Sequence, residues 1–303
     1  MTIRKNLALG MFLALCFSIC NSSAMAVEAN IYGDINYKTS YDENSSGKAY
    51  LKAENNGSKV GINATEDLGA GITGFATIEV GVDTDDSNNN PFDSRLAYVG
   101  INVGQAGSVS AGRQSSPFTD NISGHTNVFN VYGSGADQNL FARDSNTIAY
   151  SNTMGPLTFD GLVKIDGSTG KDGVDVSEYT GSMDYGIISA SGGVSSDHVN
   201  NIDYYGAGVT VSATDNISVG YTYTFKDTTT DVSGNEIIGS LTLGETKLTG
   251  GYGKVESGSA FYTTGAQRNL TDSLLTYVEY QHEDKTGSSI DTDSYSAGLK
   301  FTF

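Results

Sequence analysis

The chain has 303 residues, 38% of them hydrophobic and 17% charged, with 38 Gly, 18 Tyr, 3 Pro, no Trp and a formal net charge of −18. The apolar content excludes a wholly disordered chain, and the lack of a triplet repeat, of heptads and of a cysteine framework excludes collagen, a coiled coil and a disulfide scaffold. The acidic balance argues against nucleic acid as a partner, because a phosphate backbone requires a basic surface.

The first 26 residues have the features of a secretory signal peptide. Arg4 and Lys5 precede an apolar run over 7–20, and Ala24 and Ala26 form a cleavage site of small residues. The alternative, a membrane anchor, is disfavoured because the run is shorter than the roughly 20 residues of a spanning helix. We therefore expect residues 1–26 to be removed after export.

The remaining segment, 27–303, is expected to form a single domain without cysteine chemistry. Both cysteines, Cys16 and Cys20, lie in the leader, so the mature chain can form neither a disulfide nor a thiol-ligated metal site. No apolar run of 18 residues follows the leader. An exported soluble protein and a β-barrel, whose spans alternate in polarity, both remain open at this point.

Alternation with period two dominates the mature chain. In 57–66, 71–82, 216–226 and 293–303, apolar side chains fall on one face and Gly, Ser, Thr, Asn or Lys on the other. This spacing indicates strands and does not fit a helix. In chain order, such runs predict sixteen strands, near 28–39, 57–67, 71–82, 93–103, 107–113, 143–151, 156–166, 177–185, 187–195, 203–213, 216–226, 235–243, 245–255, 259–268, 273–283 and 293–303.

The connections between these strands alternate between tight and long. Tight ones are expected at 67–70, 104–106, 152–155, 214–215, 244 and 270–272. Long polar ones are expected at 40–56, 83–92, 114–142, 167–176, 196–202, 227–234 and 284–292, with a short exception at 256–258. This alternation predicts an all-β fold, a transmembrane antiparallel up-and-down barrel with turns at one end and loops at the other. A soluble β-sandwich is the alternative; it is disfavoured because the polar face carries little charge.

Several segments resemble the general porins of Gram-negative bacteria, which are trimeric diffusion channels of the outer membrane. The resemblance rests on Ala-Asn-Ile-Tyr-Gly at 29–33, on Ser-Arg-Leu-Ala-Tyr-Val-Gly-Ile at 94–101, on Gly-Ser-Val-Ser-Ala-Gly-Arg-Gln at 107–114 and on the terminal Phe303. It implies a 16-stranded barrel, usually assembled as a trimer, whose third extracellular loop folds inward. The connection at 114–142 is the third long one and the longest, as that loop would be.

The resemblance also implies a charged constriction. The matching basic wall positions are Lys59, Arg95 and Arg143, and Arg113 is a fourth candidate if a bulge turns it inward; the alternative for each is a solvated cation at a strand end. Asp120 and Asp137 are the expected acids of the loop. The usual tip of that loop is replaced by Val-Tyr-Gly-Ser-Gly at 131–135.

The last strand matches the family's C-terminal assembly signal, which the barrel-assembly machinery reads. Tyr295, Leu299, Phe301 and Phe303 fall on its apolar face. The same residues also fit an ordinary lipid-facing strand.

The expected function is that of a water-filled channel in the outer membrane of a Gram-negative bacterium, for passive diffusion of small hydrophilic solutes and ions. The acidic balance predicts a weak cation preference. Expected partners are two further copies, lipid, lipopolysaccharide and the assembly machinery; no cofactor, metal or catalytic residue is expected. The only histidines, His125, His198 and His282, lie in loops or at strand ends without a Ser-centred motif, which disfavours an enzyme. A substrate-specific sugar channel, which would need an aromatic track along the lumen, and a barrel adhesin remain alternatives.

Overall fold

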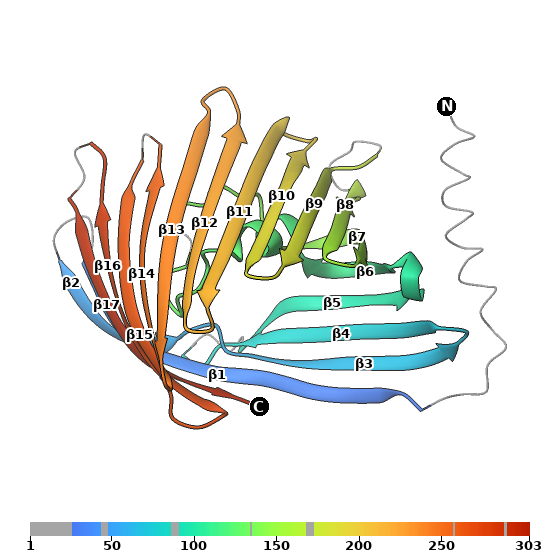
Figure 1. Ribbon diagram of the computed structural model, residues 1–303, viewed down its shortest axis with the longest axis horizontal. Coiled ribbons are helices and arrows are strands. Elements are labelled where there is room, and N and C mark those ends of the chain that lie inside the picture. The colour runs from blue at the N-terminus through green and yellow to red at the C-terminus, as the bar shows by residue number, and fades with distance from the viewer. Residues whose placement is uncertain are drawn as a thin grey trace.

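The computed structural model describes residues 26–43, 48–85, 91–133, 135–167, 173–256, 258–287 and 290–303, so the expected signal peptide up to residue 25 lies outside the described part. The described residues form one antiparallel sheet that closes on itself through the pairing of β1 with β17 (Figure 1). The strands are β1 (Glu28–Glu43), β2 (Ala49–Asn55), β3 (Lys59–Gly69), β4 (Ile72–Val82), β5 (Phe92–Asn102), β6 (Ser108–Ser115), β7 (Arg143–Met154), β8 (Leu157–Lys164), β9 (Val176–Tyr185), β10 (Ile188–Asp197), β11 (Ile202–Thr214), β12 (Ile217–Asp227), β13 (Val232–Leu243), β14 (Thr246–Val255), β15 (Ala260–Asn269), β16 (Leu274–Asp284) and β17 (Thr292–Thr302). Two short helical turns, η1 (Gly104–Ala106) and η2 (Thr119–Ser123), complete the elements.

β2 and β3 are the two halves of one interrupted strand. Both pair with β1, β3 along its first half and β2 along its second. The break falls at Gly57, whose φ of +78° lies in the left-handed region. There the Ser58 hydroxyl replaces the missing ladder bonds, since it accepts from the Asn36 N–H at 2.9 Å and donates to the Asn36 carbonyl at 3.2 Å. Counted this way the barrel has sixteen strands, which confirms the predicted fold.

The first connection differs from the prediction. A long loop at 40–56 is wrong, because β1 continues to Glu43 and β2 begins at Ala49. This segment carries polar residues that obscure its alternating pattern. Their side chains face inward and bond to one another: Lys38 pairs with Glu54 at 3.4 Å, and the Ser40 hydroxyl donates to Asp42 at 2.9 Å. Tyr41 and its partner Leu51 keep the outward face apolar.

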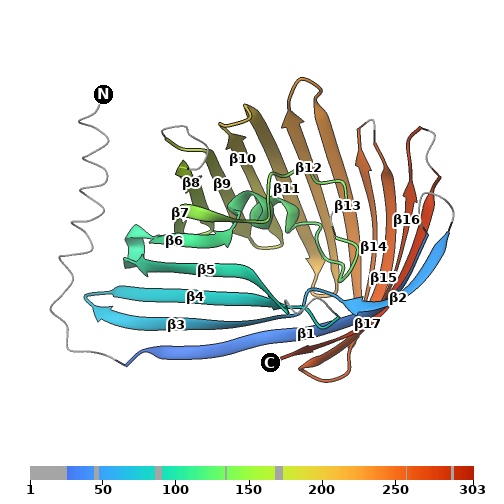
Figure 2. The ribbon, with the colours of Figure 1, turned by 180° about the vertical axis from the view of Figure 1, so that it is seen from behind.

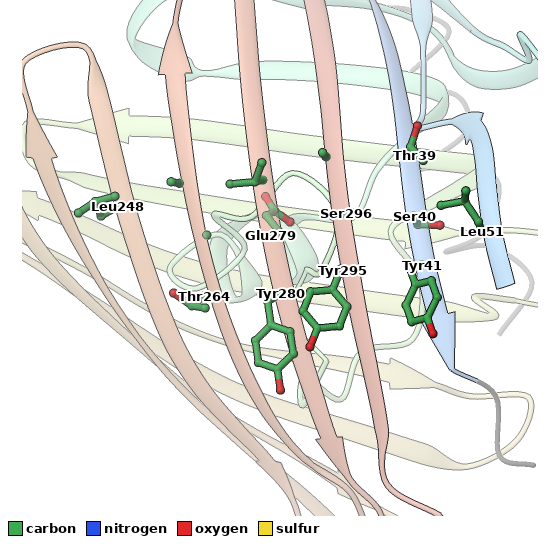
Figure 3. Close-up of a pocket in the computed structure, with 14 residues that line it drawn as sticks. Thr39, Ser40, Tyr41, Leu51, Leu248, Thr264, Glu279, Tyr280, Tyr295 and Ser296 are labelled. Carbon is green, nitrogen blue, oxygen red and sulfur yellow. The ribbon is translucent and has the colours of Figure 1, made fainter. Parts of the chain in front are cut away.

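The two faces of the barrel wall have opposite polarity. Outward side chains are large, apolar and exposed, for example Ile31 at 68% and Val99 at 61%, whereas inward ones are Gly, Ser, Thr and carboxylates. Near the loop end, tyrosines gather on the outer face (Figure 3): the ring centroid of Tyr295 lies 4.9 Å from that of Tyr280 and 6.3 Å from that of Tyr41. Amphipathic tyrosines suit the boundary between hydrocarbon and water.

The connections between strands differ in length at the two ends of the barrel. Two-residue turns such as 186–187 and 244–245 join strands at one end, and the loops at the other end are longer. The longest connection by far is 116–142, between β6 and β7. No helix in the described part of the chain is long and apolar enough to cross a membrane.

Candidate functional site

The segment between β6 and β7 lies inside the barrel (Figures 1 and 2). Its turn η2 presses Phe118 and Ile122 against Tyr204 of β11, and all three side chains are at most 5% exposed. Opposite them β11 carries Gly206, where an added Cβ would come within 2.8 Å of Phe118 and 2.9 Å of Ile122. In this hollow protein, the contact between loop and wall is therefore the main buried hydrophobic cluster of the described residues.

Two carboxylates of the wall hold the loop. Glu178 of β9, which is fully buried, accepts bonds from the Ser116 hydroxyl at 2.7 Å and from the Phe118 N–H at 3.3 Å. The hydroxyl of Ser195 also donates to it, at 2.9 Å. Because the loop's buried N–H and hydroxyl groups need partners, this contact fixes the start of the loop.

Glu279 of β16 holds the middle of the loop in the same way. It accepts from the backbone N–H groups of Asn130 at 2.6 Å, Val131 at 2.9 Å and Tyr132 at 3.3 Å. The Asn130 side-chain amide adds a fourth bond at 3.1 Å. The loop thus crosses the lumen from β9 to β16 with an anchor at each side.

Between these anchors, and just after the second one, the loop lies directly on the wall. The ring of His125 bonds to Thr210 at 2.8 Å and to Ser191 at 2.9 Å. Burial lowers the pKa of His125. At Gly220 of β12 an added Cβ would collide with the carbonyl oxygen of His125, and at Gly234 of β13 with that of Ala136. These wall glycines make the close approach possible.

The four expected basic residues gather on the wall formed by β3 and β5 to β7. Lys59 lies 3.8 Å from Asp34, and the Arg95 Nε donates to Glu79 at 2.6 Å. The Arg113 guanidinium donates to the Ser94 carbonyl and the Ser145 hydroxyl, both at 3.1 Å. Arg143 interacts electrostatically with Arg95, Arg113, Glu79 and Asp120.

β-Bulges bring these side chains together. Glu79 pairs with Leu96 and Val80 with Ser94, so Arg95 is the extra residue of a bulge and is aimed at Glu79. A second irregularity lies between β6 and β7, where Asn146 has a φ of +61°. Simple alternation therefore fails for Arg95 and Arg113.

Of the two expected loop acids, only Asp120 faces this basic cluster. Desolvation by the surrounding loop and wall raises the pKa of Asp120, and the charge of Arg143 opposes that shift. Asp137 instead accepts a bond from the Thr222 hydroxyl of β12 at 3.0 Å. Its role as an acid of the constriction stays a prediction.

The C-terminal residues lie on the outer face. Tyr295, Leu299, Phe301 and Phe303 are each about half exposed, at 49–52%. The backbone of Phe303 exchanges two 3.0 Å bonds with Gly33, so the last residue helps to close the barrel.

Sequence reasoning missed the carboxylates Glu79, Glu178 and Glu279. Each lies on the inward face of its strand among other polar or aromatic residues, as Glu279 does beside Tyr277 and Glu283, so no local signal marks it. Aromatic side chains also lie in the lumen: Phe75 and Tyr98 are on the inward face, with ring centroids 6.4 Å apart, and Tyr277 is buried beside the loop.

A hollow of about 670 Å³ lies over the outer face of β14 to β17 and β1 (Figure 3). Tyr41, Leu51, Tyr280 and Tyr295 form its rim. It belongs to the apolar outside and not to the lumen. Among the described residues, no group of three or more acidic or histidine side chains is placed to hold a metal ion.

Comparisons with known proteins agree with this architecture. The chain matches the model of the Gram-negative porin family over residues 12–302. No curated protein sequence matches it. Among solved structures, it is similar to an anion-selective porin from Comamonas acidovorans, with a TM-score of 0.78 and 18% identity over 92% of this chain and 100% of the other.

Two further structures have a similar fold. The OmpF protein of Salmonella typhi, solved in complex with daunomycin, has a TM-score of 0.77 and 13% identity over 91% of this chain and 97% of its own. OmpT of Vibrio cholerae in a trimer form has a TM-score of 0.70 and 15% identity over 92% and 100%.

Proposed function

Since the chain belongs to the Gram-negative porin family and is therefore an outer-membrane channel protein, we propose that it passes small hydrophilic solutes and ions by passive diffusion, without catalysing a reaction. The observation that carries this proposal is the loop at 116–142, held inside the barrel by Glu178 and Glu279 and facing the basic cluster through Asp120. A sixteen-stranded barrel is too wide for its own side chains to fill. One anchored loop would narrow such a lumen without closing it.

We further propose a weak preference for cations. The loop end of the barrel carries Asp83, Asp85, Asp227, Asp231, Asp284 and Asp291. These charges would concentrate cations at the entrance within a Debye length of about 8 Å at physiological salt. The basic cluster acts in the opposite direction, but Lys59 is paired with Asp34 and Arg95 with Glu79, which cancels two of its four positive charges.

The test is conductance in a planar lipid bilayer under a KCl gradient, using protein that begins at Val27, the mature start we propose. Stable conductance steps with a reversal potential on the cation side are expected. Well-folded barrels without any conductance would refute the channel. A reversal potential on the anion side would refute the charge argument and assign selectivity to Lys59, Arg95, Arg113 and Arg143.

We propose a homotrimer as the assembly, which the trimer form of the similar Vibrio cholerae protein supports. Conductance steps in groups of three, together with the mass of the detergent complex, test it. We also propose that Tyr295, Leu299, Phe301 and Phe303 act as the assembly signal, and that lipid and lipopolysaccharide cover the outer face. Removal of Phe303 is expected to lower the amount of barrel inserted in cells.

A substrate-specific channel is the second candidate. It is favoured by Phe75 and Tyr98, which place aromatic rings on the lumen face where a diffusion pore needs none. Saturable transport of one solute class would support it.

A further inference from the structure

A hollow of about 420 Å³ opens into the lumen between the inward loop and strands β4 to β8. Its apolar side is formed by Phe75 of β4 and Tyr98 of β5, whose rings meet edge to face at 77°. Phe75 lies over Gly100, where an added Cβ would collide with the ring, so the ring is in direct contact with the wall. Phe75 lies four residues closer to the turn end of β4 than Glu79. The hollow therefore lies beside the basic cluster, on its turn-end side.

The other side of the hollow is acidic. Asp120 of the loop and Asp160 of β8 both line it and repel each other. The Asn121 side-chain amide donates to Asp160 at 2.9 Å and to Thr180 at 2.7 Å, so the Asp160 carboxylate is held in place. The described residues that line the hollow include no Lys or Arg. Arg143 lies outside the hollow, and of the two carboxylates it interacts electrostatically with Asp120.

We propose that this hollow is a binding subsite for small organic cations, namely amines with an aromatic or aliphatic body. An ammonium group between Asp120 and Asp160 relieves their repulsion. The body of the same molecule lies on Phe75 and Tyr98, whose π faces also attract a cation. An organic anion would confront two carboxylates, and a neutral polyol would leave their charges uncompensated. The inference rests on the proposed channel function and names the class of solute that binds inside the lumen.

The experiment compares three probes of one shape, benzylamine, benzyl alcohol and benzoate, added at pH 7 to single channels in a planar bilayer. Benzylamine is expected to interrupt the current at concentrations at least about fivefold lower than benzyl alcohol, and benzoate not at all. Asp160→Asn is expected to weaken the benzylamine block about fivefold or more. Asp215→Asn, at an exposed turn far from the hollow, is the matched control and is expected to leave the block unchanged.

Three results would overturn the proposal. Equal block by benzylamine and benzyl alcohol would mean that the carboxylates take no part. A block that survives Asp160→Asn would place the amine elsewhere in the lumen. Stronger block by a neutral sugar such as maltose would assign the hollow to polyols.

A second measurement separates this proposal from the channel itself. Calorimetric titration of benzylamine into the folded barrel in detergent needs no ion flow. Binding that Asp160→Asn abolishes supports the subsite even if the bilayer shows no conductance. Lack of binding refutes the subsite even if the channel conducts.

Discussion

The anchor at Glu279 provides the sharpest test of how the inward loop is held. In Glu279→Gln, the side chain keeps its size but loses its charge and one of its two acceptor oxygens. The backbone N–H of Asn130 uses one carboxylate oxygen and those of Val131 and Tyr132 share the other, at 2.6 to 3.3 Å, so the new amide N–H₂ faces at least one donor.

The cost follows from the kind of bond that is lost. A hydrogen bond to a charged group contributes about 1.5–3 kcal/mol, and a neutral one about 0.5–1.5 kcal/mol. Losing one charged bond and weakening the rest therefore costs the anchor about 2 kcal/mol. At about 1.4 kcal/mol for each factor of ten, the population with the loop detached from β16 rises roughly 30-fold. Glu178 and the cluster around Phe118 still hold the start of the loop, so the barrel itself stays folded.

The assay is single-channel recording with a matched protease digestion. The variant is expected to show frequent transitions between conductance levels, and faster cleavage within 128–133, at an unchanged unfolding temperature. Glu245→Gln is the control, because Glu245 lies in an exposed turn and is 3.8 Å from an exposed Arg268. If Glu279→Gln shows no more conductance transitions and no faster cleavage than the control, Glu279 does not hold the loop and the reasoning fails.

Three further predictions concern the same loop and wall. Gly220→Ala is expected to push the loop off the wall and change the conductance, whereas Gly239→Ala, with nothing within 4 Å of its added Cβ, is expected to leave it unchanged; equal conductances would refute the close approach. Arg95→Gln is expected to shift the reversal potential toward cations, with Arg268→Gln, at the exposed turn, as the control; no difference between the two would remove Arg95 from the constriction. His125 has a lowered pKa, so its contribution to loop packing is full above the ordinary histidine pKa of about 6.5 and is lost as the pH falls through the lowered value. Current noise is therefore expected to rise in acid, and His125→Gln to remove that pH dependence; an identical acid response in the variant would assign it to another group.

Much of the candidate site could not be found from the sequence. Arg95 was named only through the family resemblance, since a bulge breaks the alternation that would otherwise place it. A bulge depends on how two strands meet, and a single strand's pattern does not carry that information. The contact of Asp137 could not be found from the sequence for a related reason: a loop acid has no periodicity, and its partner Thr222 is 85 residues away.

The sequence by itself determined the barrel. Side chains of a strand alternate with period two, and a wall between lipid and water must carry opposite polarity on its faces, so local composition alone reveals the strands, the faces and the two kinds of connection. Only the tertiary structure decided how the lumen is narrowed. Glu178 and Glu279 bond to loop residues that are about 60 and 149 positions away in the sequence. Gly220 and Gly234 are required only because the loop backbone lies directly against them. Such contacts depend on how the whole chain closes.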